Sequence, residues 1–240
     1  MKHLNNYITE YIIKKKLDKP IYSGTPILYT PKNNGELADL IIKLLKDDET
    51  NLNCIDVSNV RVMQNLFDYV NDNVIVKDID ISEWDVSNVI DMTEMFTNCN
   101  KFDCDLSKWD VSKVKYMDNM FEGCKKFTGK GLENWDVSNV INTKYMFYKC
   151  ENFTGKGLEN WDVSKVENMQ DMFEGCKKFE GKGLENWDVS NVKDMTNMFA
   201  NCENFKGKGL ENWNVRNVKD MFFIFYNCKS LKNTPKWYKE

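Results

Sequence analysis

The sequence lacks the features of a membrane protein, and its charge is close to balanced. No apolar run approaches the roughly 20 residues that a transmembrane helix needs, and the first ten residues show no secretory signal. The formal charge of −4 gives no electrostatic reason to expect nucleic acid or an anionic membrane as a partner. We therefore predict no membrane insertion, and we expect a protein that acts inside a cell or in a virus particle.

Histidine is nearly absent, and the cysteines do not form a metal-binding motif. His3 is the only histidine, and none of the eight cysteines belongs to a C-x-x-C pair, so we expect neither zinc nor another cofactor. Six cysteines recur at one position of a repeat, while Cys54 and Cys104 lie outside it. Side chains of one column point in parallel, which argues against disulfides in a chain without a secretory signal. We expect buried free thiols that pack as small apolar groups.

Repetition is what the sequence has in abundance. Six tryptophans follow one another at intervals of 25, 26, 26, 26 and 26 residues: Trp84, Trp109, Trp135, Trp161, Trp187 and Trp213. The unit reads W-D-V-S-x-V-x-x-M-x-x-M-F-x-x-C-x-x-F, and a degenerate copy begins at Ile55, which makes seven units. A constant period in this range is typical of a solenoid, in which each unit buries its apolar face against its neighbours.

Two apolar patterns lie within each unit. Alternation places Trp109 and Val111 on one face of a short strand, with Lys108 and Asp110 on the other. The residues that follow at intervals of three and four are Val114, Met117, Met120, Phe121 and Cys124. These intervals are typical of one face of a helix of about ten residues. We therefore predict an α/β solenoid of the leucine-rich-repeat type, with a short parallel strand and a short helix in every coil of 25–26 residues.

The two ends of the chain differ from the repeat. Residues 1–50 contain apolar residues at helical spacing, which predict one helix over residues 4–12 and a second beginning near Asn34. An open solenoid exposes its first coil, so these helices are expected to form an N-terminal cap, with a separate docking segment as the alternative. Residues 51–240 form the predicted solenoid of seven coils. Pro235 cannot donate to a following strand, which indicates a C-terminal cap.

Four loops between coils carry a Gly-Lys-Gly sequence. They are Gly129–Gly131, Gly155–Gly157, Gly181–Gly183 and Gly207–Gly209. We expect the glycines to supply positive φ angles, and the lysines to form weak ion pairs with nearby glutamates on a solvated surface. The loops lack the Ser or Thr that follows the lysine of a phosphate-binding loop.

The repeat closely resembles that of the BspA-like leucine-rich-repeat surface proteins, whose unit also occurs in mycoplasma lipoproteins and in some phage and giant-virus proteins. The resemblance covers roughly residues 55–240. It implies a right-handed leucine-rich-type solenoid with a role in adhesion or protein binding, and it supplies no catalytic residues. The chain departs from the surface members of the family because it shows no signal or lipid anchor, which fits an intracellular or virion-borne relative.

Polar columns are the candidate binding residues. An aspartate column comprises Asp85, Asp110, Asp136, Asp162 and Asp188, and an asparagine column comprises Asn134, Asn160, Asn186 and Asn212. In one interpretation each aspartate accepts backbone N–H groups of its own turn, and the serine two residues later caps a helix. In the other, both columns form a polar strand face that recognises a basic partner or bridges calcium ions.

The arrangement of polar groups does not favour catalysis. An active site needs unlike groups that converge in one cleft, whereas these polar residues are copies of one another spread along a face. We therefore predict a non-catalytic repeat scaffold for protein–protein interaction, with a protein partner. The alternative is a structural or adhesive surface component of a cell or a virion.

Overall fold

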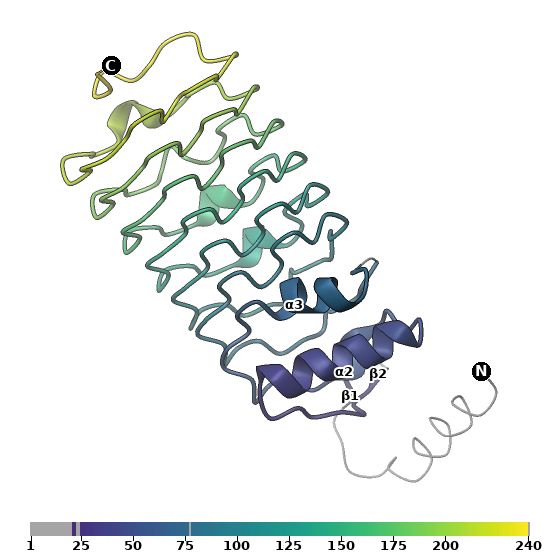
Figure 1. The fold of residues 1–240 in the computed structure, drawn as a ribbon. Coiled ribbons are helices and arrows are strands. Elements are labelled where there is room, and N and C mark those ends of the chain that lie inside the picture. Colours follow the sequence, from purple (N-terminus) through teal and green to yellow (C-terminus); the bar gives the residue numbers. More distant parts are fainter. Residues whose placement is uncertain (1–20, 23–24, 77, 240) are drawn as a thin grey trace.

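The computed structural model describes residues 21–22, 25–76 and 78–239. Figure 1 shows their backbone as successive coils stacked along one direction, with helices α2 and α3 towards one end of the stack and the C-terminus at the other. Apolar side chains from all the coils join into one continuous core. The helix predicted over residues 4–12 lies outside the described residues.

Helix α2 (Asn34–Lys46) covers the first coil. The side chain of Asn33 caps its N-terminus by accepting the backbone N–H of Glu36 at 3.0 Å. Leu37 and Ile41 are completely buried in the same core as the coils. The second helix predicted from the sequence is therefore confirmed, and it packs against the N-terminal end of the stack.

The other regular elements are short. They are the antiparallel pair β1 (Ile21–Tyr22) and β2 (Thr25–Pro26), helix α3 (Leu66–Asn73), and the 3-10 turns η1 (Leu52–Cys54), η2 (Leu132–Asn134), η3 (Leu158–Asn160) and η4 (Leu210–Asn212). None of the helices in the described part of the chain is long and apolar enough to cross a membrane.

The predicted α/β solenoid, with a parallel strand and a helix in every coil, is wrong. After α3, the described coils contain no α-helix and no strand, and neighbouring coils meet at isolated parallel bridges such as Tyr116 with Asn142. The segment predicted to be helical contains two residues with left-handed backbone, Asn119 at φ 57° and Gly123 at φ 71°. Such angles interrupt both a right-handed helix and an extended strand. The same two positions have positive φ in each of the later coils.

Each coil is a run of turns that hydrogen-bonds to the next coil. Alternate backbone N–H groups of one coil donate to alternate carbonyls of the following one. The donors are Met117, Asn119, Phe121 and Gly123, and the acceptors are Asn142, Lys144, Met146 and Tyr148, at 3.2, 2.8, 2.9 and 2.8 Å. The N–H of Met120 instead closes a turn onto the carbonyl of Met117 at 3.3 Å. The stack therefore satisfies its backbone by a parallel ladder between turns.

Aromatic columns fill the core, as the repeat predicts. The rings of Trp109, Trp135 and Trp161 stack with centroids 6.4 Å apart and planes within 2° of parallel. The indole N–H of Trp161 donates to the carbonyl of Leu132 in the previous coil at 3.0 Å. Each buried tryptophan therefore fills the core and also satisfies a backbone carbonyl.

The predicted buried thiols of the repeat are confirmed. In the repeated cysteine column, Cys99, Cys124, Cys150, Cys176 and Cys202 are buried, and Cys228 at the open end is partly exposed. The thiol of Cys150 donates to the carbonyl of Phe121 at 3.0 Å, and burial raises the pKa of Cys99 to about 12. These cysteines are structural groups with little thiolate character.

Candidate functional site

The aspartate column lies at the surface, and each of its carboxylates accepts a hydrogen bond within its own turn. Asp110, Asp136, Asp162 and Asp188 are exposed and Asp85 is half-buried. In all five, Oδ1 accepts the backbone N–H of the serine two residues later, at 2.9 to 3.1 Å. Hydrogen bonds from Ser112 lower the pKa of Asp110. The turn-capping interpretation is therefore confirmed for the aspartates.

The serines do not cap helices, because no helix follows them in the described coils. The asparagine column also contributes to the scaffold. Asn134 donates its side-chain amide to the carbonyl of Ser107 at 3.0 Å, and Asn160 donates to that of Glu133 at 3.2 Å. Asn186 and Asn212 are exposed at the same position. The aspartates therefore hold their own turns, and Asn134 and Asn160 join neighbouring coils.

The aspartate column is also the candidate for calcium binding. In the described ranges, no three His, Cys, Asp or Glu side chains lie together in a way that could hold a metal ion. Calcium bridging between the aspartates stays a prediction.

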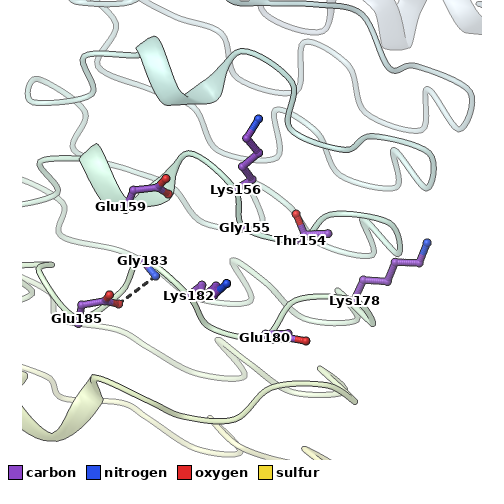
Figure 2. A pocket seen from close by; sticks show the side chains of 9 residues that line it. All are labelled: Thr154, Gly155, Lys156, Glu159, Lys178, Glu180, Lys182, Gly183 and Glu185. Atoms are coloured by element: carbon purple, nitrogen blue, oxygen red, sulfur yellow. Dashed lines mark hydrogen bonds between the residues drawn. The ribbon is translucent and has the colours of Figure 1, made fainter.

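A charged groove runs between two Gly-Lys-Gly loops (Figure 2). Its volume is about 590 Å3, and it is lined by Thr154, Gly155, Lys156, Glu159, Lys178, Glu180, Lys182, Gly183 and Glu185. The predicted positive φ angles are confirmed at all eight loop glycines. The carboxylate of Glu185 accepts the N–H of Gly183 at 3.0 Å, and Lys156 pairs with Glu133 of the previous coil at 3.6 Å. The charges of the three lysines and three glutamates in the groove therefore cancel. Glu185 also holds the Gly183 turn, and Lys156 forms an ion pair with the previous coil.

A third surface carries residues that differ from coil to coil. We call it the turn face, and it consists of the positions equivalent to Asp118, Asn119 and Glu122 in each coil. Its residues are Thr93, Glu94 and Thr97; Asp118, Asn119 and Glu122; Lys144, Tyr145 and Tyr148; Gln170, Asp171 and Glu174; Thr196, Asn197 and Ala200; and Phe222, Phe223 and Tyr226. The core columns are nearly constant over the same coils, so the turn face is where one coil is distinguished from another.

Several carboxylates of the turn face have a raised pKa. Partial burial raises the pKa of Glu94, and the nearby charges of Asp68, Asp118 and Glu122 raise it further. Burial likewise raises the pKa of Asp118. This direction is opposite to that of Asp110, whose charge is stabilised by its own turn. Hydrogen bonds from Thr93 and Asn142 to Asp118, and from Asn201 to Glu174, offset only part of the cost of burying these acids.

The centre of the turn face holds a carboxyl pair. Asp171 is 3% exposed; its Oδ1 accepts from Asn197 at 3.0 Å, and its Oδ2 has no hydrogen-bond partner in the described chain. Partial burial and the adjacent Asp171 raise the pKa of Glu174 to about 7. Near neutral pH, Glu174 is therefore only partly ionised. Burial and Asp171 also raise the pKa of Tyr145 to about 12.

Comparison with known families identifies the chain. A family model described as "Mycoplasma protein of unknown function, DUF285" matches residues 40–158 and 142–239. The chain belongs to the DUF285 family. At the level of the family, this agrees with the resemblance to the BspA-like repeat proteins. No curated protein and no solved structure matches the chain.

The candidate binding residues chosen from the sequence are the repeated polar columns of this DUF285 chain, and their binding role stays a prediction. The aspartate column was conspicuous because it repeats, yet its repetition reflects one turn-capping role in every coil. The acids of the turn face were missed because they stand at the unassigned positions of the motif. The signal that could have found them is irregularity, since Asp171 and Glu174 replace a pair of tyrosines, Tyr145 and Tyr148, found one coil earlier.

Proposed function

We propose that this DUF285 chain is a non-catalytic scaffold that binds a basic protein segment along its turn face. The acids involved form what we call the acidic turn face, which comprises Glu94, Asp118, Glu122, Asp171 and Glu174. A cationic segment placed along them would relieve their mutual repulsion and their loss of hydration.

The observation that carries this proposal is the contrast between two sets of acids on one molecule. The pKa values of Asp110 and Asp162 are lowered because each accepts hydrogen bonds within its own turn. The pKa values of Glu94, Asp118 and Glu174 are raised because each is partly buried, with further acids close by. Perturbed groups of this kind gather at functional sites, whereas satisfied groups are typical of a scaffold.

The backbone of the turn face supports the same assignment. Tyr145, at φ 56°, occupies a left-handed position where other coils have Asn119 or Asn197. A large side chain is less favourable than asparagine in this conformation, so its presence costs stability. Residues that retain such a cost are concentrated at functional sites. The ammonium group of Lys144 lies over the ring of Tyr145, and that of Lys149 lies over the ring of Tyr148. These two lysines limit the acidic surface on that coil.

Affinity capture with two matched variants tests the proposal. The turn-face variant carries Glu94→Gln, Asp118→Asn, Glu122→Gln, Asp171→Asn and Glu174→Gln. The control variant carries Asp85→Asn, Asp110→Asn, Asp136→Asn, Asp162→Asn and Asp188→Asn. Each variant replaces five acids by their amides, and the control keeps the side-chain oxygens that accept the serine N–H groups. Proteins captured from a mycoplasma lysate would be compared by quantitative mass spectrometry.

The expected result is that basic partners are retained by the wild type and the control, and are lost with the turn-face variant. Loss with the control alone would assign binding to the aspartate column. Equal loss with both would mean that net charge, and no particular surface, accounts for capture.

A structural or adhesive surface component is the second candidate function, and the resemblance of the repeat to that of the BspA-like surface proteins is what supports it. Brief protease treatment of intact mycoplasma cells, followed by detection of the chain, distinguishes the two. Digestion would support surface display. Protection until the cells are lysed would support an internal scaffold, and abundance in purified virus particles would support a virion-borne one.

A further inference from the structure

The coil ladder ends in an open row of donors at the C-terminal coil. In the coil before it, the N–H of Asn197 donates to the carbonyl of Phe222 at 2.9 Å, and that of Phe199 donates to Ile224 at 3.0 Å. The equivalent donors one coil later are the N–H groups of Met221, Phe223, Phe225 and Asn227. Among the described residues, no oxygen accepts from these four N–H groups. The terminal coil is therefore an edge whose alternate backbone N–H groups could pair with an extended chain.

Apolar side chains lie along this edge. Phe222 is 70% exposed, Phe223 64% and Tyr226 60%, and the last two form a T-shaped pair with centroids 5.9 Å apart. Met221 is partly exposed, whereas the equivalent Met195 is completely buried by the following coil. The terminal coil thus presents both the hydrogen-bonding groups and the apolar surface that a further layer would cover.

A groove of about 350 Å3 extends the edge towards the C-terminal segment. It is lined in part by Phe223, Phe225, Tyr226, Leu231 and Tyr238. The C-terminal segment covers the other half of the coil, where Trp237 stacks on Trp213 with centroids 6.3 Å apart. The predicted C-terminal cap therefore protects the tryptophan side of the stack and leaves the turn side open.

The charge of this end is opposite to that of the acidic turn face. Residues 214–239 contain six Lys or Arg and one acid, Asp220. Two of the changes occur at repeat positions, since Asn214 replaces the repeated aspartate and Arg216 replaces the repeated serine. Arg216, Lys219 and Lys232 are exposed. An acidic ligand is favoured here on charge alone.

We propose that the terminal coil docks an extended acidic peptide segment of a protein partner, by addition of one strand to the open edge. Carbonyls of alternate residues would accept the four N–H groups, and apolar side chains would pack against Phe222, Phe223 and Met221. Acidic side chains would face Arg216 and the surrounding lysines. This is peptide recognition by β-augmentation, in which main-chain bonds give affinity and side-chain pockets give specificity. The site is separate from the acidic turn face, and either proposal can fail alone.

A second copy of the chain fits the edge less well. The opposite end of the stack is covered by α2, and the side chain of Asn34 already donates to the carbonyl of Gln64 at 2.8 Å. Head-to-tail stacking would therefore require α2 to leave. Two C-terminal coils brought face to face would set donors against donors and cations against cations.

A peptide copied from an interior coil is the probe. Inside the stack, residues 166–175 accept hydrogen bonds from the coil before them, as the docked strand would from the terminal coil. They carry three acids, Glu167, Asp171 and Glu174, and no Lys or Arg. A fluorescein-labelled, N-acetylated and C-amidated peptide of this sequence would be titrated with the full chain at low salt, and binding followed by fluorescence anisotropy. We expect saturable binding that weakens as salt is added. A peptide with all three acids changed to Gln or Asn is expected to bind at least tenfold more weakly.

The matched variant converts the terminal turn face to that of the preceding coil by Phe222→Thr, Phe223→Asn and Tyr226→Ala. These side chains already occur on the same backbone in that coil, so folding is preserved, and far-ultraviolet circular dichroism checks this. The variant is expected to lose at least tenfold in peptide affinity, while Tyr148→Ala in an interior coil is expected to retain it. Absence of binding to the wild type, or equal binding to the triple variant, would overturn the proposal. So would concentration-dependent self-association in sedimentation velocity that the triple variant abolishes.

Discussion

Replacement of Trp161 by alanine tests how strongly one column residue stabilises the stack. Trp161 is 4% exposed, and its ring stacks on Trp135 at 6.4 Å and lies 6.1 Å from Phe147. Its indole N–H donates to the carbonyl of Leu132 at 3.0 Å. Alanine would remove the ring from both aromatic neighbours and take one of two donors from the Leu132 carbonyl, which keeps the backbone N–H of Trp135 at 3.2 Å.

The magnitude follows from the area and the hydrogen bond. Burial of about 150 to 250 Å2 at about 25 cal/mol/Å2 stabilises by roughly 4 to 6 kcal/mol as an upper value. Collapse of the cavity recovers part of this, and Trp→Ala changes in cores cost about 3 to 5 kcal/mol. We therefore expect Trp161→Ala to lower the free energy of unfolding by about 3 to 5 kcal/mol. Trp161→Phe keeps most of the ring and loses the N–H, and it is expected to cost about 1 to 3 kcal/mol.

Guanidinium unfolding followed by circular dichroism is the assay, with Trp237→Ala as the control. Trp237 contacts the equivalent rings, Trp213 and Phe225, but is partly exposed, so its loss should cost less than the loss of Trp161. Repeat proteins unfold with nearest-neighbour coupling, so a central change should also broaden the transition. Equal effects at the two positions, or no change at Trp161, would show that the stacked column does not determine stability.

The remaining predictions concern a proton and a glycine. Because the pKa of Glu174 is raised above its unfolded value of 4.5 to about 7, its contribution to stability is present below pH 4.5 and is lost as pH rises through 7. Glu174→Gln should therefore raise Tm at pH 8 and have little effect at pH 4; a Tm difference that does not depend on pH would contradict the raised pKa of Glu174. Gly157→Ala should destabilise by about 1 to 3 kcal/mol or more, because φ is 95° and a Cβ would lie 2.6 Å from the backbone nitrogen of Glu133. Gly35→Ala, in α2, is its control in thermal unfolding and should be neutral or stabilising, because a Cβ there would lie 3.4 Å from Oδ1 of Asn33, an ordinary contact.

The sequence predicted which residues face the core, and it did not predict the backbone that places them there. Trp135 and Val137 are buried while Asp136 is exposed, as alternation requires. The intervals of three and four after Val140 also mark buried positions correctly. A run of turns closed between residues three apart produces the same intervals as a helix, so periodicity alone could not distinguish the two.

The overlooked clue was the residue type at the two left-handed positions. Asn119, Gly123, Gly175, Asn197 and Asn201 belong to the two residue types that adopt positive φ most readily. Their recurrence four residues apart predicts an interrupted backbone, which outweighs the helical spacing of the apolar residues. The open edge of the terminal coil could not be found in this way, because it depends on which N–H groups the following segment leaves uncovered.

Large residues at the left-handed positions connect the fold to the two proposed surfaces. Asparagine fits this backbone at Asn119 and Asn197, so Tyr145 at φ 56° and Phe223 at φ 57° each cost stability relative to a residue that the repeat already uses. Phe223 is also 64% exposed, so little burial offsets its cost in the isolated chain. A partner that covers the ring would supply the missing contacts. The coil whose donors are open thus also carries a large residue at a left-handed position, and the docking of a further chain would offset both costs.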